Sequence, residues 1–311
     1  KHSSGLKPSA AREAMEDLQT SSFVGARHSV RAISLLKKQR QRRPDLVMRF
    51  GAPLLESKHS SGLKPIELYS IYEEVFIAAL DLKDVPTADR CLNALRARFP
   101  SSHRVSCLEA MMSEASGKYK EALVKYDAII ESDPSNTHVM KRRIAVMQSS
   151  GNNSGAASAL VEYLDTYSGD LDAWLELAKL YTTEAQYRKA AFCWEEILLL
   201  APMNEVFHCK YAETLYTLGG SDVKTARKYF AHSLNINPHG NTRALYGLLM
   251  CCHAMSGGVS LSSQAKGKGS RDKDGASQTA ELFEHTAVKL RAAYASNPSQ
   301  LKLVERMIEQ M

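Results

Sequence analysis

The stretch LDAWLELAKLYTTEAQYRKAAFCWEEILLLAPMN, residues 171–204, decides the fold of this chain. Its apolar residues recur every three or four positions in two runs, which is the pattern of two successive amphipathic helices. The first run includes Trp174 and Tyr181, and the second begins near Ala190. Pro202 follows the second run, and proline cannot continue a helix. The stretch therefore predicts a pair of helices that ends just before this proline.

Prolines in equivalent places divide the chain into units of similar length. Pro100, Pro134, Pro202 and Pro238 are 34, 68 and 36 residues apart, and the member missing from the series falls at Ser168. Each proline follows an apolar helical pattern, so we predict a helix end at or just before each one.

Two further positions recur at fixed distances before these prolines and before Ser168. A small residue twelve places earlier implies that two helices approach closely there, and a bulky residue stands eight places earlier. The small residues are Ala88, Ala122, Ala156, Ala190 and Ala226, and the bulky residues are Leu92, Tyr126, Leu160, Trp194 and Phe230.

A helix–turn–helix unit of 34 residues with this spacing resembles the tetratricopeptide repeat. The resemblance implies an all-α fold, a superhelical solenoid of antiparallel helix pairs, with no β-sheet. A sixth unit begins at Asn241. The five units before it are Tyr69–Ser102, His103–Asn136, Thr137–Asp170, Leu171–Asn204 and Glu205–Gly240.

Composition divides the chain into four segments. Residues 1–66 form a basic N-terminal segment with linkers, in which Ser29–Leu36 and Leu46–Leu55 are expected to be helical. The repeats occupy 67–255. A stretch rich in Gly, Ser and Lys, 256–278, is expected to be a disordered linker. Helical patterning returns in 279–311, which is expected to cap the solenoid.

The octapeptide KHSSGLKP occurs twice, at residues 1–8 and 58–65. It has one large apolar residue beside Gly, Pro and Ser, so it has no face to bury and is typical of a turn or loop. We interpret the duplication as a copying artefact and not as a structural repeat. The second copy is expected to be the linker into the first repeat.

Charge and cysteine content exclude several classes of function. The net charge of +6 comes from residues 1–66, which hold 13 Lys and Arg against 5 Asp and Glu, so the remainder sums to −2. A nucleic-acid-binding body would show the opposite distribution. No apolar run approaches the ~18 residues of a membrane span. The six cysteines lie in helical contexts without a Cys-x-x-Cys motif, which favours reduced thiols in a cytosolic protein.

No constellation of residues indicates catalysis, a metal or a cofactor, so the chain is not expected to be an enzyme. Cys251, Cys252 and His253 are adjacent, but neighbouring positions on a helix point in different directions and no second ligand pair follows at metal spacing. Buried thiols in a packed helix are the favoured interpretation. Histidines at helix starts or on faces stand singly and favour capping or surface roles. They are His103, His138, His208 and His232.

The basic run KKQRQRR, residues 37–43, has two interpretations. It could be a nuclear-import or anionic-surface patch. The solvated end of a helix is favoured, because charge runs usually form a solvated face.

The first helix of each repeat lines the concave face in tetratricopeptide proteins. Here that lining is mixed, with apolar residues and charges of both signs, which suits a protein segment better than a small anion. The clamp for chaperone C-termini, which needs Lys at the fifth place and Asn at the ninth place of one repeat with further Lys or Arg in the next, is absent. The residues predicted to contact partners are Arg104, Met111, Lys141, Leu175, Lys179, Glu213 and Tyr216.

A closer resemblance extends from about Ile71 to Ala254. The chain is similar to subunit 2 of the ER membrane protein complex, and the block at Tyr187–Glu196 is its most specific part. The stretches that carry the resemblance are IYEEVFIAALD (71–81), FPSSHRV (99–105), YDAIIESDPSNTHVMKRRIAV (126–146), AWLELAKLYTTEAQYRKAAFCWEEILL (173–199) and YAETLYTLGG with the segments after it (211–248).

This resemblance implies a non-enzymatic scaffold on the cytosolic face of the endoplasmic reticulum. Its partners would be other subunits of the complex, namely the cytosolic tails and loops of membrane subunits and a second soluble subunit. The complex would insert transmembrane segments of tail-anchored and multi-spanning proteins. Membrane contact would come only through partners. The alternative is another tetratricopeptide adaptor, in RNA processing or cell-cycle machinery.

Overall fold

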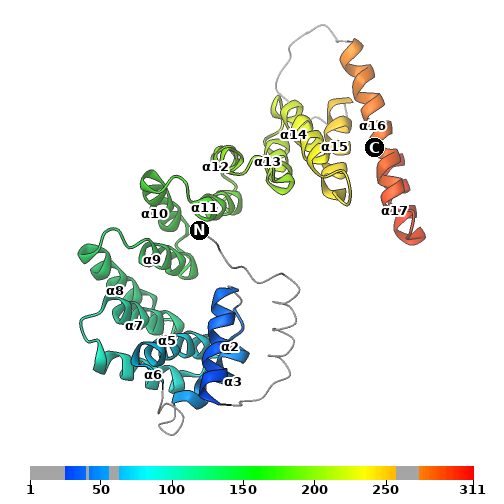
Figure 1. Ribbon diagram of the computed structural model, residues 1–311. Coiled ribbons are helices and arrows are strands. Elements are labelled where there is room, and N and C mark those ends of the chain that lie inside the picture. The colour runs from blue at the N-terminus through cyan, green and yellow to red at the C-terminus, as the bar shows by residue number, and fades with distance from the viewer. Residues whose placement is uncertain (1–24, 40–41, 56–62, 257–272) are drawn as a thin grey trace, which may run out of the picture. The chain divides into compact units, whose positions relative to one another are not determined.

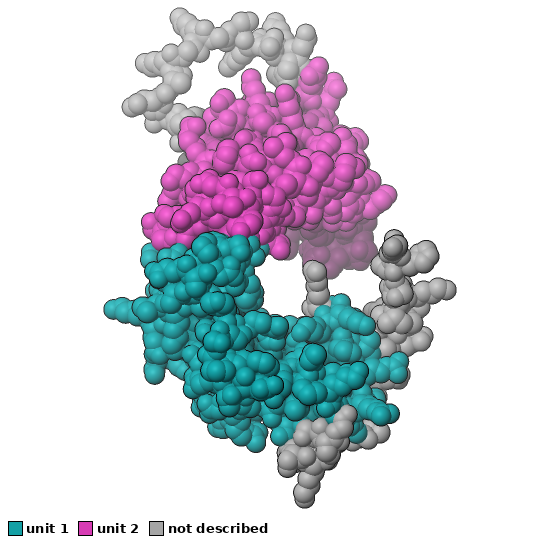
Figure 2. Space-filling view, turned by 60° about the vertical axis from the view of Figure 1, so that its left-hand side comes forward, with its two compact units in different colours: residues 1–152 teal, residues 153–311 magenta. Residues whose placement is uncertain are grey.

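The computed structural model describes residues 25–39, 42–55, 63–256 and 273–311, with side chains in the last range from Gln278 onward. Every regular element in these ranges is a helix, and no strand occurs in them, as predicted (Figure 1). The chain forms two compact units, residues 1–152 and 153–311 (Figure 2). The boundary falls inside the predicted third repeat, between its two helices.

The described part of unit 1 starts with two helices and a short 3₁₀ turn, and continues with the first two predicted helix pairs and the first helix of the third. Consecutive helices α5 and α6, and α7 and α8, pack as antiparallel pairs. The elements are α2 (Ala26–Lys38), α3 (Pro44–Gly51), η1 (Ala52–Leu55), α5 (Pro65–Asp81), α6 (Val85–Arg98), α7 (His103–Ala115), α8 (Tyr119–Ser132) and α9 (Thr137–Ser149).

Unit 2 contains the remaining repeats and the C-terminal helices. Each helix packs against the next one along the chain. The elements are α10 (Asn153–Thr166), α11 (Leu171–Thr183), α12 (Tyr187–Leu200), α13 (Glu205–Leu218), α14 (Asp222–Ile236), α15 (Thr242–Ser256), α16 (Lys273–Ala293) and α17 (Pro298–Glu309).

The predicted helix ends are confirmed. Helices α6, α8, α12 and α14 each end two residues before their proline. The residue between helix and proline leaves the helical region, as Phe99 does with φ −131° and ψ 63°. The proline ring disfavours helical geometry in the residue before it, which explains this uniform ending. Helix α10 also ends two residues before Ser168, so the period persists where the proline is missing.

The two recurring positions are core positions in every repeat. All five alanines have no exposed surface, and the bulky residues range from fully buried to 9% exposed at Trp194. Close packing without any side chain also occurs in unit 2. A Cβ atom added to Gly247 of α15 would lie 2.3 Å from the ring of Phe230 on α14.

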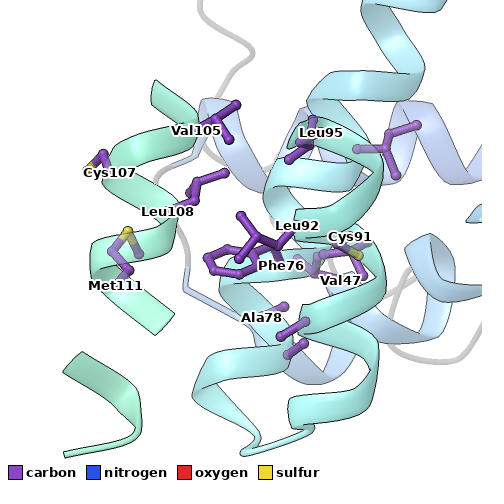
Figure 3. Close-up of a cluster of buried hydrophobic side chains, with 14 of the residues drawn as sticks. Val47, Phe76, Ala78, Cys91, Leu92, Leu95, Val105, Cys107, Leu108 and Met111 are labelled. Carbon is purple, nitrogen blue, oxygen red and sulfur yellow. The ribbon is translucent and has the colours of Figure 1, made fainter. Parts of the chain in front are cut away.

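The core of unit 1 forms between consecutive pairs as well as within them. Phe76 of α5, Leu92 and Leu95 of α6, and Leu108 of α7 point toward one another (Figure 3). Burial of side chains from three successive helices means that no pair can complete its core alone, which is the usual property of repeat proteins.

Two residues of the basic run 37–43 form ion pairs with α5, the first helix of the first repeat. Lys37 pairs with Glu74 of α5 at 2.6 Å, and Arg42 donates to Asp81 of the same helix at 2.8 Å. These two acidic residues lie seven positions apart, and therefore on one face of α5. The favoured interpretation as the solvated end of a helix is confirmed for Lys37, Lys38 and Arg42, which are exposed, although Lys37 and Arg42 also pair with α5. Residues 40–41 lie outside the described ranges.

Most of the other predictions for the two ends of the chain hold. Helices α2 and α3 confirm the N-terminal pair. Pro65, the last residue of the second octapeptide, is the first residue of α5. The first copy and residues 58–62 lie outside the described ranges. Helices α16 and α17 confirm the C-terminal pair, whose Leu290, Val304 and Ile308 pack with residues of α15.

The predicted linker 256–278 is corrected in its last part, because α16 begins at Lys273. Residues 257–272 lie outside the described ranges.

Trp194 tests the packing register of unit 2. Its ring is 9% exposed and lies 6.3 Å from the ring of Phe207 on α13. Truncation leaves a large cavity, so Trp194→Ala should lower the free energy of unfolding by about 3–5 kcal/mol in urea titrations. Phe192→Ala on the same helix is the control, because Phe192 is 55% exposed and should cost much less. An unchanged melting temperature for Trp194→Ala would show that the register is wrong.

Candidate partner-binding faces

The first helices of the repeats, which carry the predicted partner-binding residues, are joined by ion pairs. In unit 1, Arg104 of α7 pairs with Glu73 of α5. Arg142 of α9 reaches Glu114 of α7 at 3.6 Å, and the Tyr126 hydroxyl donates to the same carboxylate at 3.2 Å. The charges of both signs that the sequence places on this face therefore serve partly to connect one repeat to the next.

Unit 2 repeats this connection between α13 and α15. Both oxygens of Glu213 accept from Arg243, one of them from Nη2 at 2.9 Å, and Lys210 donates to the same carboxylate at 3.2 Å. We call Arg104–Glu73, Arg142–Glu114 and Arg243–Glu213 the cross-repeat ion pairs. Each joins an arginine on one first helix to a glutamate on the preceding first helix, about one repeat earlier.

These pairs account for two of the seven predicted partner-binding residues. Arg104 and Glu213 both have an intramolecular partner of opposite charge. Sequence reasoning did not find the pairing. Arg104 and Arg243 stand at the second and third places of their repeats, so aligned repeats would have indicated an arginine near the start of successive first helices.

Met111 corrects the prediction for the concave face. It is 6% exposed and belongs to the core of unit 1. A side chain with so little free surface cannot lose much exposure when a partner binds. The residue faces inward because α7 is covered by neighbouring helices on both sides, so its ninth place is buried and not open.

The other four predicted residues retain surface. Lys141, Leu175 and Tyr216 are partly exposed, and Lys179 is exposed. Leu175 and Lys179 lie four positions apart on α11, so they share one face of that helix. Lys179 makes no ion pair with any residue that the structure describes. Their role in binding stays a prediction.

An exposed apolar corner between α12 and α13 was not foreseen. Leu199 and Met203 are 77% and 75% exposed, and Val206 is 51% exposed. In other repeats, the residues at the equivalent places of the turn are polar or small. An alignment of the repeats would therefore have revealed the apolar residues at this turn. The places of Leu199 and Met203 are taken by Ala97 and Ser101, by Glu131 and Ser135, and by Asn235 and His239.

All six cysteines are free and buried. Burial raises the pKa of the Cys91 thiol to about 11 and that of Cys193, Cys209 and Cys251 to about 12. Each of these thiols is therefore protonated at neutral pH, and the thiolate is the nucleophilic form. The interpretation of Cys251 and Cys252 as packed core residues is confirmed by their complete burial.

Two histidines are closer together than the sequence suggested. The rings of His208 and His232 lie 4.6 Å apart, so the expectation that each stands singly is wrong for this pair. His208 is buried, and its Nε2 lies 2.7 Å from the carbonyl oxygen of Pro202. The described ranges contain no cluster of three or more His, Cys, Asp or Glu arranged to hold a metal ion. Within the same ranges, no helix combines the length and apolarity needed to cross a membrane.

Comparison with known proteins identifies the family. A family model described as the EMC2 TPR-like repeat domain matches residues 88–234. The chain is also 38% identical over 281 residues to ER membrane protein complex subunit 2-A of Xenopus laevis, covering 88% of this chain and 90% of that protein. The chain belongs to the ER membrane protein complex subunit 2 family.

More distant relatives agree with this family assignment and with the fold. ER membrane protein complex subunit 2 of Dictyostelium discoideum is 30% identical over 289 residues, covering 89% of this chain and 86% of that protein. A crystal structure of the C-terminal part of a TPR repeat-containing protein from Cytophaga hutchinsonii superimposes with a TM-score of 0.55. It covers 94% of this chain and 98% of that one at 12% identity, and it supports the fold alone.

The cross-repeat pair at Glu213 should make stability depend on pH. Burial acts to raise the pKa of Glu213, but hydrogen bonds from Arg243 and Lys210 outweigh it, so the pKa is lowered overall. A lowered folded-state pKa contributes stability above the ordinary glutamate pKa of about 4.3, and this stability is lost as the pH falls through the folded value.

Glu213→Gln should therefore lower the free energy of unfolding by about 1 kcal/mol at pH 7 and by less below pH ~4. Urea titrations across this range provide the measurement. Glu284→Gln, at an exposed residue of α16, is the control and should show no such trend. Equal effects of Glu213→Gln at both pH values would show that the ion pair does not contribute.

The buried thiols should react slowly in the native protein. At pH 7.5, labelling by a thiol-reactive dye should be limited by the rate of local or global unfolding. While the protein is folded, the dye cannot reach the buried thiols, and the thiols are protonated. Full labelling should follow at once in urea. A cysteine that reacts within seconds under native conditions would contradict its burial.

Proposed function

We propose that this chain is a non-enzymatic scaffold subunit of an ER membrane protein complex. The observation that carries the proposal is the 38% identity to ER membrane protein complex subunit 2-A over nearly the whole of both chains. The all-helical repeat fold supports a binding role, because stacked helix pairs present extended faces to other proteins.

In this proposal, the chain lies on the cytosolic side of the endoplasmic reticulum membrane. It holds cytosolic tails and loops of the membrane subunits, together with a second soluble subunit. The assembled complex inserts transmembrane segments of tail-anchored and multi-spanning proteins, and the chain reaches the membrane only through its partners.

The exposed parts of the first helices are the proposed docking surfaces. In unit 2, α11 presents the exposed ammonium of Lys179 next to the partly exposed Leu175. An apolar side chain beside an unpaired charge suits a peptide segment that brings an apolar anchor and a carboxylate. The charges of the cross-repeat ion pairs are already neutralised within the chain. These residues would therefore contribute to such a contact mainly by their packing surface and less by their charge.

The proposal predicts which surface substitution disrupts assembly. Leu175→Asp and Lys179→Glu, combined in one full-length tagged chain, should reduce the recovery of the other subunits from detergent-solubilised membranes about tenfold. A loss of this size corresponds to about 1.4 kcal/mol, which is typical of removing a contributing interface residue.

The matched control is Val124→Asp with Lys120→Glu on α8. These residues have the same four-residue spacing and the same chemistry, and both are exposed. The control should leave recovery unchanged, and circular dichroism should show both double variants to be folded. Wild-type recovery with the folded α11 variant would show that the inner face of α11 is not a docking surface.

A further inference from the structure

A pocket of about 610 Å³ lies in unit 1 where the start of α5, the end of α6 and the start of α7 meet. Its floor is apolar. Leu95 of α6 faces Val105 and Leu108 of α7 there, as Figure 3 shows. A pocket of this size with an apolar floor is large enough to accept a bulky side chain and part of the segment that carries it.

Aromatic and aliphatic side chains form the wall and mouth of this pocket. The rings of Tyr69 and Phe99 meet edge to face with centroids 5.1 Å apart. Phe99 remains 40% exposed, and Ile66 in the first turn of α5 is 85% exposed. Ile66 therefore presents nearly its whole side chain to solvent beside an apolar cavity, where a bound segment would cover it.

The rim of the pocket is basic. Lys37, Arg98 and Arg104 line it together with a single carboxylate, that of Glu73. Glu73 is already paired with Arg104, and Lys37 is paired with Glu74. Arg98 lies 5.9 Å from the centre of the Phe99 ring and pairs with no carboxylate in the part of the chain that the structure describes. One guanidinium at the rim is thus available to an acidic group from outside.

The repeat fold does not require these residues. The last residue of the second helix and the one after it are Arg98 and Phe99 in the first repeat. The same two places are Ser-Asp, Thr-Tyr, Leu-Ala and Ile-Asn in the following repeats, at 132–133, 166–167, 200–201 and 236–237. An arginine followed by an exposed aromatic residue is therefore a feature of this pocket and not of the helix end.

We infer that the pocket binds an acidic–apolar segment of a partner subunit. A large apolar side chain enters against Leu95, Val105 and Leu108, and a neighbouring carboxylate pairs with Arg98. The apolar floor and the Arg98 guanidinium at the rim together suit a peptide that brings one large apolar side chain and one carboxylate. The inference rests on the proposed function, because it specifies the chemistry of one segment that the scaffold holds.

Photo-crosslinking from Ile66 tests the occupant directly. The full-length tagged chain carries p-benzoylphenylalanine in place of Ile66, and the complex is irradiated after solubilisation from membranes. Mass spectrometry should identify a segment of another subunit that has Asp or Glu within a few residues of a large apolar residue.

Charge reversal then tests the role of Arg98. Arg98→Glu should reduce the cross-link about tenfold, and changing the acidic residue of the captured segment to Arg should restore it. Arg90→Glu is the matched control, because Arg90 is exposed on the same helix but does not line the pocket.

The outcomes separate this inference from the proposed function. If the other subunits co-purify but Ile66 gives no cross-link, or cross-links to lipid or to this chain itself, the pocket does not bind a partner segment. A cross-link that is insensitive to Arg98→Glu, or a captured segment without an acidic residue, also overturns the inference. If no subunit of the complex co-purifies with the wild-type chain, the proposed function fails and the inference fails with it.

Discussion

The close approach of the two helices in each repeat is the constraint on which the rest of the structure depends. The alanines at this contact have no exposed surface in any of the five repeats. A larger side chain there would separate the helices and expose the bulky residue one turn later, which supplies much of the buried apolar area. Gly247 shows a similar constraint between two successive repeats, because the Phe230 ring of the preceding helix pair occupies the space of a side chain.

The cross-repeat ion pairs act on a structure that this packing has already formed. The arginines Arg104 and Arg243 keep most of their side-chain surface in solvent, so each pair contributes modestly to stability. Their larger effect is on the character of the inner faces. The charges of Arg104 and Arg243 are neutralised within the chain, whereas Lys179 is exposed and makes no ion pair with a described residue.

Two exposed surfaces differ from the equivalent places of the other repeats. The apolar corner at Leu199 and Met203 stands where other repeats have small or polar residues, and Arg98–Phe99 stands where the other repeats have Ser-Asp, Thr-Tyr, Leu-Ala and Ile-Asn. Residues that all repeats share maintain the solenoid, whereas residues found in one repeat are free to serve a particular contact. Both exceptions lie at the junction between one helix pair and the next.

The sequence by itself determined the helix ends at the prolines, the buried alanines and the fold class, because these depend on backbone geometry and on spacing within one repeat. Only the tertiary structure decided that Met111 is buried, that Arg104 and Glu213 are paired, that His208 lies beside His232, and that Leu95, Phe99 and Ile66 surround one pocket. Each of these facts depends on which side chains of different helices meet. Spacing within a single repeat does not contain that information. The helix pairs share one pattern of apolar residues, and only their packing decides which side chains of different pairs meet.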